Sequence, residues 1–269
     1  MMKYSIGEFA SILGVTTDTL RLYEKHGIIR PMKDDKNNYR YFDDLDVRDL
    51  YMSRWYRSMQ FSLPEVAELN KQSSIAQVSE KVDRTRANLE EEIRKSTMLL
   101  QKMTEVHQIF QTIESTLNCC QVKQLPGIYR IRQTDKNILL MNDFLRATIQ
   151  QWMNLLPFSF FSFRIEQQEI LSEEQVFNYN WGLAINETEA RYFDLHLNSD
   201  VEYIESRLCV SSVIISSGDE YMIRQSLQFM FDYLEANNHL ISGDIIGRII
   251  FTEKLEDEKR TYLEVNIPI

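Results

Sequence analysis

The sequence has little of what marks secreted, membrane-spanning or disulfide-bonded proteins. Three cysteines among 269 residues are too few for the disulfide framework of a small secreted fold. No apolar run approaches the roughly 18 residues of a membrane span, and the first residues lack the apolar core of a signal peptide. We therefore expect a cytoplasmic protein that has no membrane partner.

Signatures of catalysis and of metal binding are also missing. The four histidines are scattered, and no GxSxG, HExxH or phosphate-binding glycine-rich loop occurs. Cys119 and Cys120 are adjacent, but adjacent thiols without a Cys or His at a suitable spacing make a weak metal site. The sequence predicts that the protein is not an enzyme and uses no cofactor or metal.

The charges are unevenly distributed along the chain. The net charge is −10, yet residues 1–75 hold 11 basic and 11 acidic side chains. Residues 119–269 hold 13 basic and 22 acidic side chains, and so carry nine of the ten excess negative charges. Binding to phosphates depends on local clusters of Lys and Arg, so this acidity does not exclude DNA binding. It favours a cationic ligand for the C-terminal part.

The first 75 residues have the pattern of a helix-turn-helix. Ser5 and Glu8 form a capping box ahead of an apolar-periodic run, and Gly14 follows that run as a turn. Thr16 or Thr17 then caps a second helical pattern. In a helix-turn-helix the second helix reads the major groove of DNA.

A hairpin and two more helices are expected after this motif. Tyr39, Arg40 and Tyr41 alternate aromatic and basic side chains, which suits a short wing laid along a phosphate backbone. A third helix follows, and Ser62 with Glu65 forms a second capping box that begins a fourth. The segment thus predicts a winged helix-turn-helix domain.

Together these motifs resemble the MerR family of transcription regulators. The matching stretches are Ile6-Gly7-Glu8, Gly14-Val15, Leu20-Arg21-Leu22-Tyr23-Glu24, Gly27-Ile28-Ile29-Arg30-Pro31, Tyr39-Arg40-Tyr41-Phe42 and Met59-Gln60-Phe61-Ser62-Leu63. The resemblance implies a DNA-binding domain over residues 1–75 whose partner is double-stranded promoter DNA. The residues it places on DNA are Thr16, Thr17, Arg21, Tyr23, Tyr39, Arg40, Tyr41, Arg54 and Arg57. Tyr41 could instead belong to the core of the hairpin.

Residues 76–118 are predicted to form one long helix. The stretch contains no Pro or Gly between 78 and 117, and nine of twelve positions in two interleaved heptad series are apolar. The two series are Val82-Leu89-Ser96-Met103-Phe110-Leu117 and Val78-Thr85-Glu92-Leu99-Val106-Ile113. This pattern favours a coiled coil that builds a homodimer, and MerR-like proteins use such a helix for an antiparallel dimer. The alternative is an amphipathic helix packed on its own domain.

Residues 119–269 have the pattern of an α+β domain. Strands are expected at 128–133, 158–165, 179–185, 191–197, 208–215, 245–252 and 262–267, and helices at 141–156 and 220–237. The order of strand, helix and strands occurs twice, which predicts a duplicated unit with an antiparallel sheet. This layout and the final strand are similar to the GyrI-like effector-binding domain of multidrug-responsive MerR relatives.

That resemblance implies a small-molecule effector, and aromatic walls with carboxylates suit an aromatic or cationic lipophilic compound. The candidate ligand residues are Trp152, Tyr179, Trp181, Tyr221, Tyr262 and Glu264. In the family an acidic residue a few positions beyond the glycine that follows the helix faces the cation, but Gly247 or Arg248 stands at that place here. Glu264 is a candidate replacement. Aromatic residues at strand spacing are also common in plain cores, and Glu264 would equally suit a solvated strand edge.

The resemblance to the MerR family implies a dimeric regulator that binds a promoter spacer and distorts it when it senses an effector, which realigns the promoter for RNA polymerase. Two alternatives remain open. The C-terminal domain could have lost small-molecule binding and act as a protein-interaction module. It could also be a hydrolase, because some stand-alone GyrI-like domains are reported as hydrolases.

Overall fold

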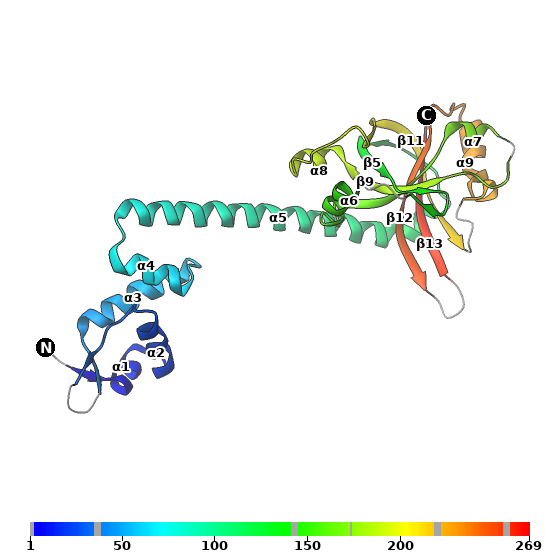
Figure 1. Ribbon diagram of the computed structural model, residues 1–269. Helices are drawn as coiled ribbons and strands as arrows, with labels where there is room; N and C mark the ends of the chain where they lie inside the picture. The colour runs from blue at the N-terminus through cyan, green and yellow to red at the C-terminus, as the bar shows by residue number, and fades with distance from the viewer. Residues whose placement is uncertain (1–2, 35–38, 141–144, 173, 218–221, 255–258) are drawn as a thin grey trace. The chain divides into compact units, whose positions relative to one another are not determined.

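The computed structural model describes residues 3–34, 39–140, 145–172, 174–217, 222–254 and 259–269. The chain divides into two compact units, Met1–Thr97 and Met98–Ile269 (Figure 1). The division falls inside one long helix, which the sequence assigned to a separate segment. None of the helices in the described ranges combines the length and the apolar character that a membrane crossing requires.

The first unit is a winged helix-turn-helix, as predicted. Its three-stranded sheet has the order β1-β3-β2, and both strand pairs are antiparallel. The elements are β1 (Tyr4–Ser5), α1 (Ile6–Leu13), α2 (Thr17–Lys25), β2 (Met32–Lys33), β3 (Arg40–Phe42), α3 (Asp44–Ser58) and α4 (Leu63–Gln72). A stack of Phe9 on Phe42, with ring centroids 4.6 Å apart, joins α1 to the hairpin in the core.

Local hydrogen bonds explain where these helices begin and end. Both predicted capping boxes form: the side chains of Ser5 and Glu8 cap α1, and those of Ser62 and Glu65 cap α4. The backbone N–H of Ser62 donates to the Glu65 carboxylate at 2.7 Å, which lowers the pKa of Glu65 to about 2. Gly14 has a φ of 63°, a left-handed conformation that ends α1 at little steric cost.

Helix α5 (Ile75–Thr116) is 42 residues long, which confirms the predicted continuous helix. The heptad interpretation needs one correction. Val78 and Val82, two of its seam positions, pack against the core of the first unit and are only partly exposed. Farther along, Leu89, Met103 and other apolar seam residues are exposed, so the surface open to a partner is shorter than the sequence suggested.

The second unit is built on an eight-stranded antiparallel sheet in the order β10-β5-β9-β8-β12-β13-β11-β4. The strands are β4 (Gln121–Leu125), β5 (Ile128–Arg132), β8 (Ser159–Ile165), β9 (Asn180–Asn186), β10 (Glu202–Ile204), β11 (Arg207–Ser217), β12 (Ile245–Lys254) and β13 (Lys259–Pro268). A separate two-stranded ribbon joins β6 (Thr134–Asp135) and β7 (Ile138–Leu139). The helices are α6 (Arg146–Met153), α7 (Gln167–Leu171), α8 (Glu187–Tyr192) and α9 (Arg224–Ala236).

The predicted duplication is present in the topology. The series β5, α6, β8, β9 is repeated by β11, α9, β12, β13, and the two three-strand groups mirror each other about the β8–β12 pair. The edge strands β4 and β10 were not predicted. Because side chains alternate along each strand, one face of this sheet can pack on helices while the other faces elsewhere.

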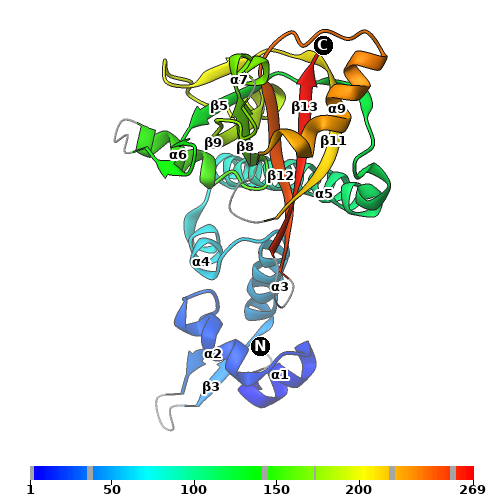
Figure 2. The ribbon, with the colours of Figure 1, turned by 90° about the vertical axis from the view of Figure 1, so that its right-hand side faces the viewer.

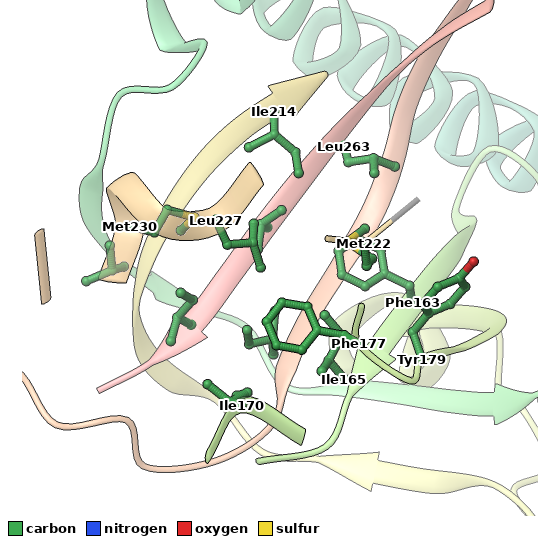
Figure 3. Close-up of a cluster of buried hydrophobic side chains, with 14 of the residues drawn as sticks. Phe163, Ile165, Ile170, Phe177, Tyr179, Ile214, Met222, Leu227, Met230 and Leu263 are labelled. Carbon is green, nitrogen blue, oxygen red and sulfur yellow. The ribbon is translucent and has the colours of Figure 1, made fainter. Parts of the chain in front are cut away.

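Helices α6 and α9, one from each repeat, cover the same face of the sheet (Figure 2). Under α9 the core contains Leu227 and Met230 against Ile214 and Leu263, and Phe163 lies in the same cluster (Figure 3). Under α6 a second cluster surrounds a fully buried tryptophan. The opposite face is therefore the one available for a ligand cavity.

The structure corrects three expected elements. The strand expected at 191–197 is wrong, because Glu187 and Glu189 lie in the first turn of α8, where their charges favour the helix N-terminus. The apolar residues that suggested this strand, Phe193, Leu195 and Leu197, pack on the α6 core from an irregular segment. Helices α6 and α9 begin later than expected, and residues 141–144 and 218–221 lie outside the described part.

Candidate nucleic-acid interface and ligand cavity

The first unit carries a shallow depression between the helix-turn-helix and the end of α3. Its lining residues are Gly14, Val15, Thr16, Thr19, Tyr23, Arg54, Arg57 and Ser58. The structure thus brings together four residues that the sequence placed on DNA, from two elements some 40 positions apart in the chain. Thr16 and Tyr23 lie on one side of the depression, and Arg54 and Arg57 lie on the other.

The polar side chains of this depression differ in whether they already form hydrogen bonds within the protein. The Thr16 hydroxyl caps α2 by accepting the Thr19 N–H at 3.1 Å. Arg57 donates to the carbonyl of Phe61. Arg54 is exposed and has no hydrogen-bond or ion-pair partner among the described residues. Arg54 can therefore bind a phosphate without giving up a hydrogen bond inside the protein, whereas Arg57 would have to release the Phe61 carbonyl.

Two further basic candidates are paired inside the unit. Arg21 lies on α2 and its guanidinium is 3.1 Å from the Asp18 carboxylate, with both side chains well exposed. The Arg40 Nε on β3 donates to Glu24 at 2.7 Å. An exposed ion pair such as that of Arg21 contributes little stability, so Arg21 can exchange its partner for a phosphate, whereas Arg40 would have to leave a partly buried pair.

The remaining candidates of the wing and of α2 are placed as follows. Tyr39 is exposed, with 64% of its surface accessible, whereas Tyr41 is half-buried under the Lys3 ammonium, which lies 5.9 Å above the ring. Thr17 is half-buried as the first residue of α2, and Tyr23 is buried. Tyr39 is thus the more accessible of the two wing tyrosines.

The second unit holds a cavity of about 660 Å³ on the sheet face opposite α6 and α9. The part of α5 in this unit contributes Lys102 and Glu105 to its wall. Its apolar lining comes from Leu125, Pro126, Ile128, Phe160, Ile204, Ile246 and Pro268. Small-molecule sites commonly have such a size and such a mixture of apolar surface with a few polar groups.

One charged cluster of the wall contains a single carboxylate between two cations. Glu264 on β13 accepts the Arg248 Nε at 2.6 Å and also pairs with the Lys123 ammonium. The Arg248 guanidinium carbon lies 5.6 Å from the centroid of the Phe160 ring. Burial alone would raise the pKa of Glu264, but Arg248 and Lys123 outweigh it and hold the pKa below its ordinary value.

A second cluster contains two arginines and two carboxylates. The Arg164 Nε donates to Asp244 at 2.7 Å and its NH1 donates to Glu202 at 2.9 Å. Arg130 lies 3.6 Å from the same Glu202 carboxylate and is fully buried. Its Nε donates to Ser162, and burial lowers the pKa of Arg130 to about 10, so its charge persists at neutral pH.

The other wall carboxylates are paired too. Glu105 lies 3.3 Å from Lys102, which also contacts Glu189 at 2.9 Å, and Glu205 pairs with Arg207 at 2.7 Å. Among the described residues, five basic and five acidic side chains line the cavity, and each carboxylate already has a cationic partner. The wall therefore lacks the excess of negative charge found in the sequence around it.

Comparison with known proteins identifies the first unit. The model of the MerR HTH family regulatory protein matches residues 4–73. A probable heavy metal-dependent transcriptional regulator from Haemophilus influenzae is 30% identical over 108 residues, which cover 38% of this chain and 84% of that protein. The chain belongs to the MerR family of transcription regulators.

Other relatives of this MerR-family chain match different shares of it. The HTH-type transcriptional activator TipA from Streptomyces coelicolor is 37% identical over 68 residues, 25% of this chain and 27% of that protein. A solved EcmrR–DNA complex covers 98% of both chains at 17% identity, with a TM-score of 0.40. The match to TipA is thus about as long as the family-model match to the DNA-binding unit.

The structure of this MerR-family chain places most of the sequence-derived ligand candidates away from the cavity. Trp152, Tyr179 and Trp181 are buried in the cores under α6 and α9, so they are core residues and not ligand residues as the sequence suggested. Tyr262 packs on Phe251, with ring centroids 5.3 Å apart, and does not line the cavity. Tyr221 lies outside the described residues. Aromatic alternation marked the strands at 158–165 and 179–185 but did not tell which sheet face is covered.

Glu264 lines the cavity, and the neighbouring strand explains the departure from the family pattern. A Cβ at Gly247 would lie 2.2 Å from the Phe163 ring and 2.2 Å from the Glu264 carbonyl oxygen, so position 247 faces the packed core. Arg248 is one residue further along and lines the cavity. The β12 side chain that lines the cavity at this place is thus a cation in this MerR-family chain, and not the carboxylate of the family pattern.

Sequence reasoning missed several wall residues, among them Lys123, Arg164, Glu202 and Asp244. Lys123 and Glu202 lie on edge strands that were not predicted. The partners of Arg164 are 38 and 80 positions away in the chain. A signal was present in Arg164 alone, because a charged residue inside an otherwise apolar strand marks the face that is not packed.

Proposed function

We propose that this chain is a dimeric regulator that binds double-stranded promoter DNA through its first unit. The observation that carries this proposal is the shared depression, where the start of α2 meets Arg54 and Arg57 of α3. In a helix-turn-helix the second helix enters the major groove, while flanking arginines bind the phosphate backbone. The wing residues Tyr39 and Arg40 supply a further backbone contact beside it.

Regulation in this proposal works through the shape of the DNA. The protein binds the spacer between two promoter elements and, with its effector bound, bends and untwists it so that RNA polymerase engages both elements. Smooth bending of a site of this size costs roughly 1–6 kcal/mol, which phosphate contacts offset. An effector needs to favour the distorting conformation by only a few kcal/mol to switch the output.

Dimerisation is assigned to α5. Its exposed apolar side chains include Leu89, Leu99, Met103 and Val106, spaced along one heptad pattern. Exposed apolar residues at this spacing bury themselves when a second helix packs alongside. Two DNA-binding units in one dimer then contact two half-sites of a pseudo-palindromic operator.

The effector site in this proposal is the cavity of the second unit, which functions as a GyrI-like effector-binding domain. Support comes from its volume of about 660 Å³, from its apolar lining and from the partly buried charge clusters that border it. The same helix α5 belongs to both units, so ligand binding at Lys102 and Glu105 has a continuous element through which it can act.

Selection of duplexes from a random pool tests the DNA-binding part. The full chain should enrich a pseudo-palindrome, and footprinting should protect both half-sites on one face of the duplex. Arg54→Gln and Arg57→Gln should weaken binding across all enriched sequences, whereas Arg84→Gln on α5 removes the same charge from outside the depression and should not. Failure to enrich any duplex would contradict the proposal.

A further inference from the structure

The most informative group in the cavity is the guanidinium of Arg248. Its Nε is engaged by Glu264, but its two terminal nitrogens have no acceptor in the part of the chain that the structure describes. Its side chain is 30% exposed and lines the cavity. Stacking near the Phe160 ring leaves the N–H donors free at the edge of the guanidinium plane. These donors suit a carboxylate or another planar anion.

The local charge points the same way. Lys123 and Arg248 share the single carboxylate of Glu264, which leaves this corner of the cavity with one excess positive charge. Glu264 has no other cation to attract, because both of its oxygens are occupied by these two partners. A bound cation would therefore have to displace an arginine or a lysine, whereas a bound anion finds unused donors.

The second charge cluster offers a cation no better site. Glu202 is shared by Arg164 and the fully buried Arg130, and Asp244 is held by Arg164. Drawing Glu202 away from its arginines would leave the fully buried Arg130 without a carboxylate partner, which costs several kcal/mol. The net acidity of the surrounding sequence is thus not available inside the cavity.

The remaining wall selects for an apolar body. Phe160, Ile246 and Ile128 line the cavity, with Phe160 beside Arg248, and aromatic compounds bury well against such side chains. From this geometry we propose that the cavity binds small aromatic anions, with the carboxylate held by Arg248 and the ring packed over Phe160. The inference rests on the proposed effector-binding function and names the ligand class for that site.

Three ligands that share one ring test this assignment. Calorimetry on the full chain would compare 2-naphthoate, 2-naphthylmethanol and 2-naphthylmethylammonium, which differ in charge. The anion should bind tightest and the ammonium weakest. Arg248→Gln should weaken 2-naphthoate by roughly 10- to 100-fold, as expected for the loss of charge-assisted hydrogen bonds, and should leave the alcohol unchanged. Arg191→Gln removes an exposed charge of the same unit outside the cavity and serves as the control.

Each outcome has a distinct meaning. Tighter binding of the ammonium than of the anion overturns the ligand class but leaves the cavity as an effector site. Failure of all three ligands to bind overturns both this inference and the effector-binding proposal. If Arg248→Gln loses the alcohol as well, Arg248→Lys decides, because it keeps the charge and should still prefer the anion to the ammonium. The charge reversal Arg248→Glu should invert that preference.

Discussion

The salt dependence of DNA binding gives the sharpest test of the proposed interface. Arg54 lies exposed at the depression and has no internal partner in the described ranges, so a phosphate that it binds releases a counterion without breaking a pair. Arg40 differs, because it must first give up its 2.7 Å contact with Glu24. The two arginines should therefore contribute unequally to the electrostatics of binding.

The expected magnitude follows from counterion release. Each phosphate contact contributes about 0.9 to the slope of log Kobs against log salt. A dimer uses two copies of Arg54, so Arg54→Gln should flatten the slope by about 1.8. Raising the salt from 50 to 200 mM weakens DNA binding by both proteins. The variant should lose about tenfold less affinity over this range than the parent protein does. Arg40→Gln should flatten the slope less, because Glu24 already neutralises much of the Arg40 charge in the free protein.

Fluorescence anisotropy on a duplex enriched by the protein itself measures these slopes. Arg84→Gln provides the matched loss of charge on α5. An unchanged slope for Arg54→Gln would refute the phosphate contact, even if affinity at one salt concentration fell. If the slope flattened by about 0.9 and not by 1.8, Arg54 would still contact a phosphate, but in only one of the two subunits.

Three further outcomes are expected. Leu227→Ala should reduce the free energy of unfolding by about 2–5 kcal/mol in urea titrations, because the side chain is fully buried under α9, whereas Gln228→Ala at the exposed neighbouring position should change it by less than about 0.5 kcal/mol. Glu65→Gln should destabilise the first unit by about 1 kcal/mol at neutral pH, a value reduced for the 40% exposure of the side chain. Because the pKa of Glu65 is about 2 in the folded state and 4.5 ordinarily, the contribution is complete above pH 4.5 and disappears as the pH falls to 2, which hydrogen exchange of α4 amides at several pH values would show. Met103→Glu should convert the dimer to a monomer in light scattering. Gln101→Glu, at an exposed position outside the two heptad series, should not.

Much of the first unit could be predicted because its signals are local. The capping box of Ser5 with Glu8 and the turn at Gly14 depend on residues within a few positions of each other. The long helix was equally legible from the absence of Pro and Gly. What the sequence could not reveal is that Val78 and Val82 pack on the unit's own core, because apolar heptad positions do not specify whether their partner is the same chain or a second copy.

The cavity was harder to predict because its chemistry is non-local. Strand pairing brings Lys123 to Glu264, which lies 141 positions away in the chain. Neither segment alone contains a pattern that predicts this contact. The aromatic residues misled for a related reason. In a sheet covered by helices on one face, the richest aromatic positions are those that fill the core, and Trp152 and Trp181 do so.

The alternation of side chains along β12 decides what the cavity can bind. Position 247 points into the core, where the Phe163 ring leaves room for no Cβ, so a carboxylate introduced there could not reach a ligand. Position 248 faces the cavity and is an arginine. A carboxylate at the position that lines the cavity would attract cations, whereas the arginine at this position attracts anions. The acidic composition of residues 119–269 does not distinguish these two cases, because they differ by one residue along the strand. In the proposed assignment, ligand class in this unit is set by the register of one strand and by the pairing of Glu264, and not by the net charge of the unit.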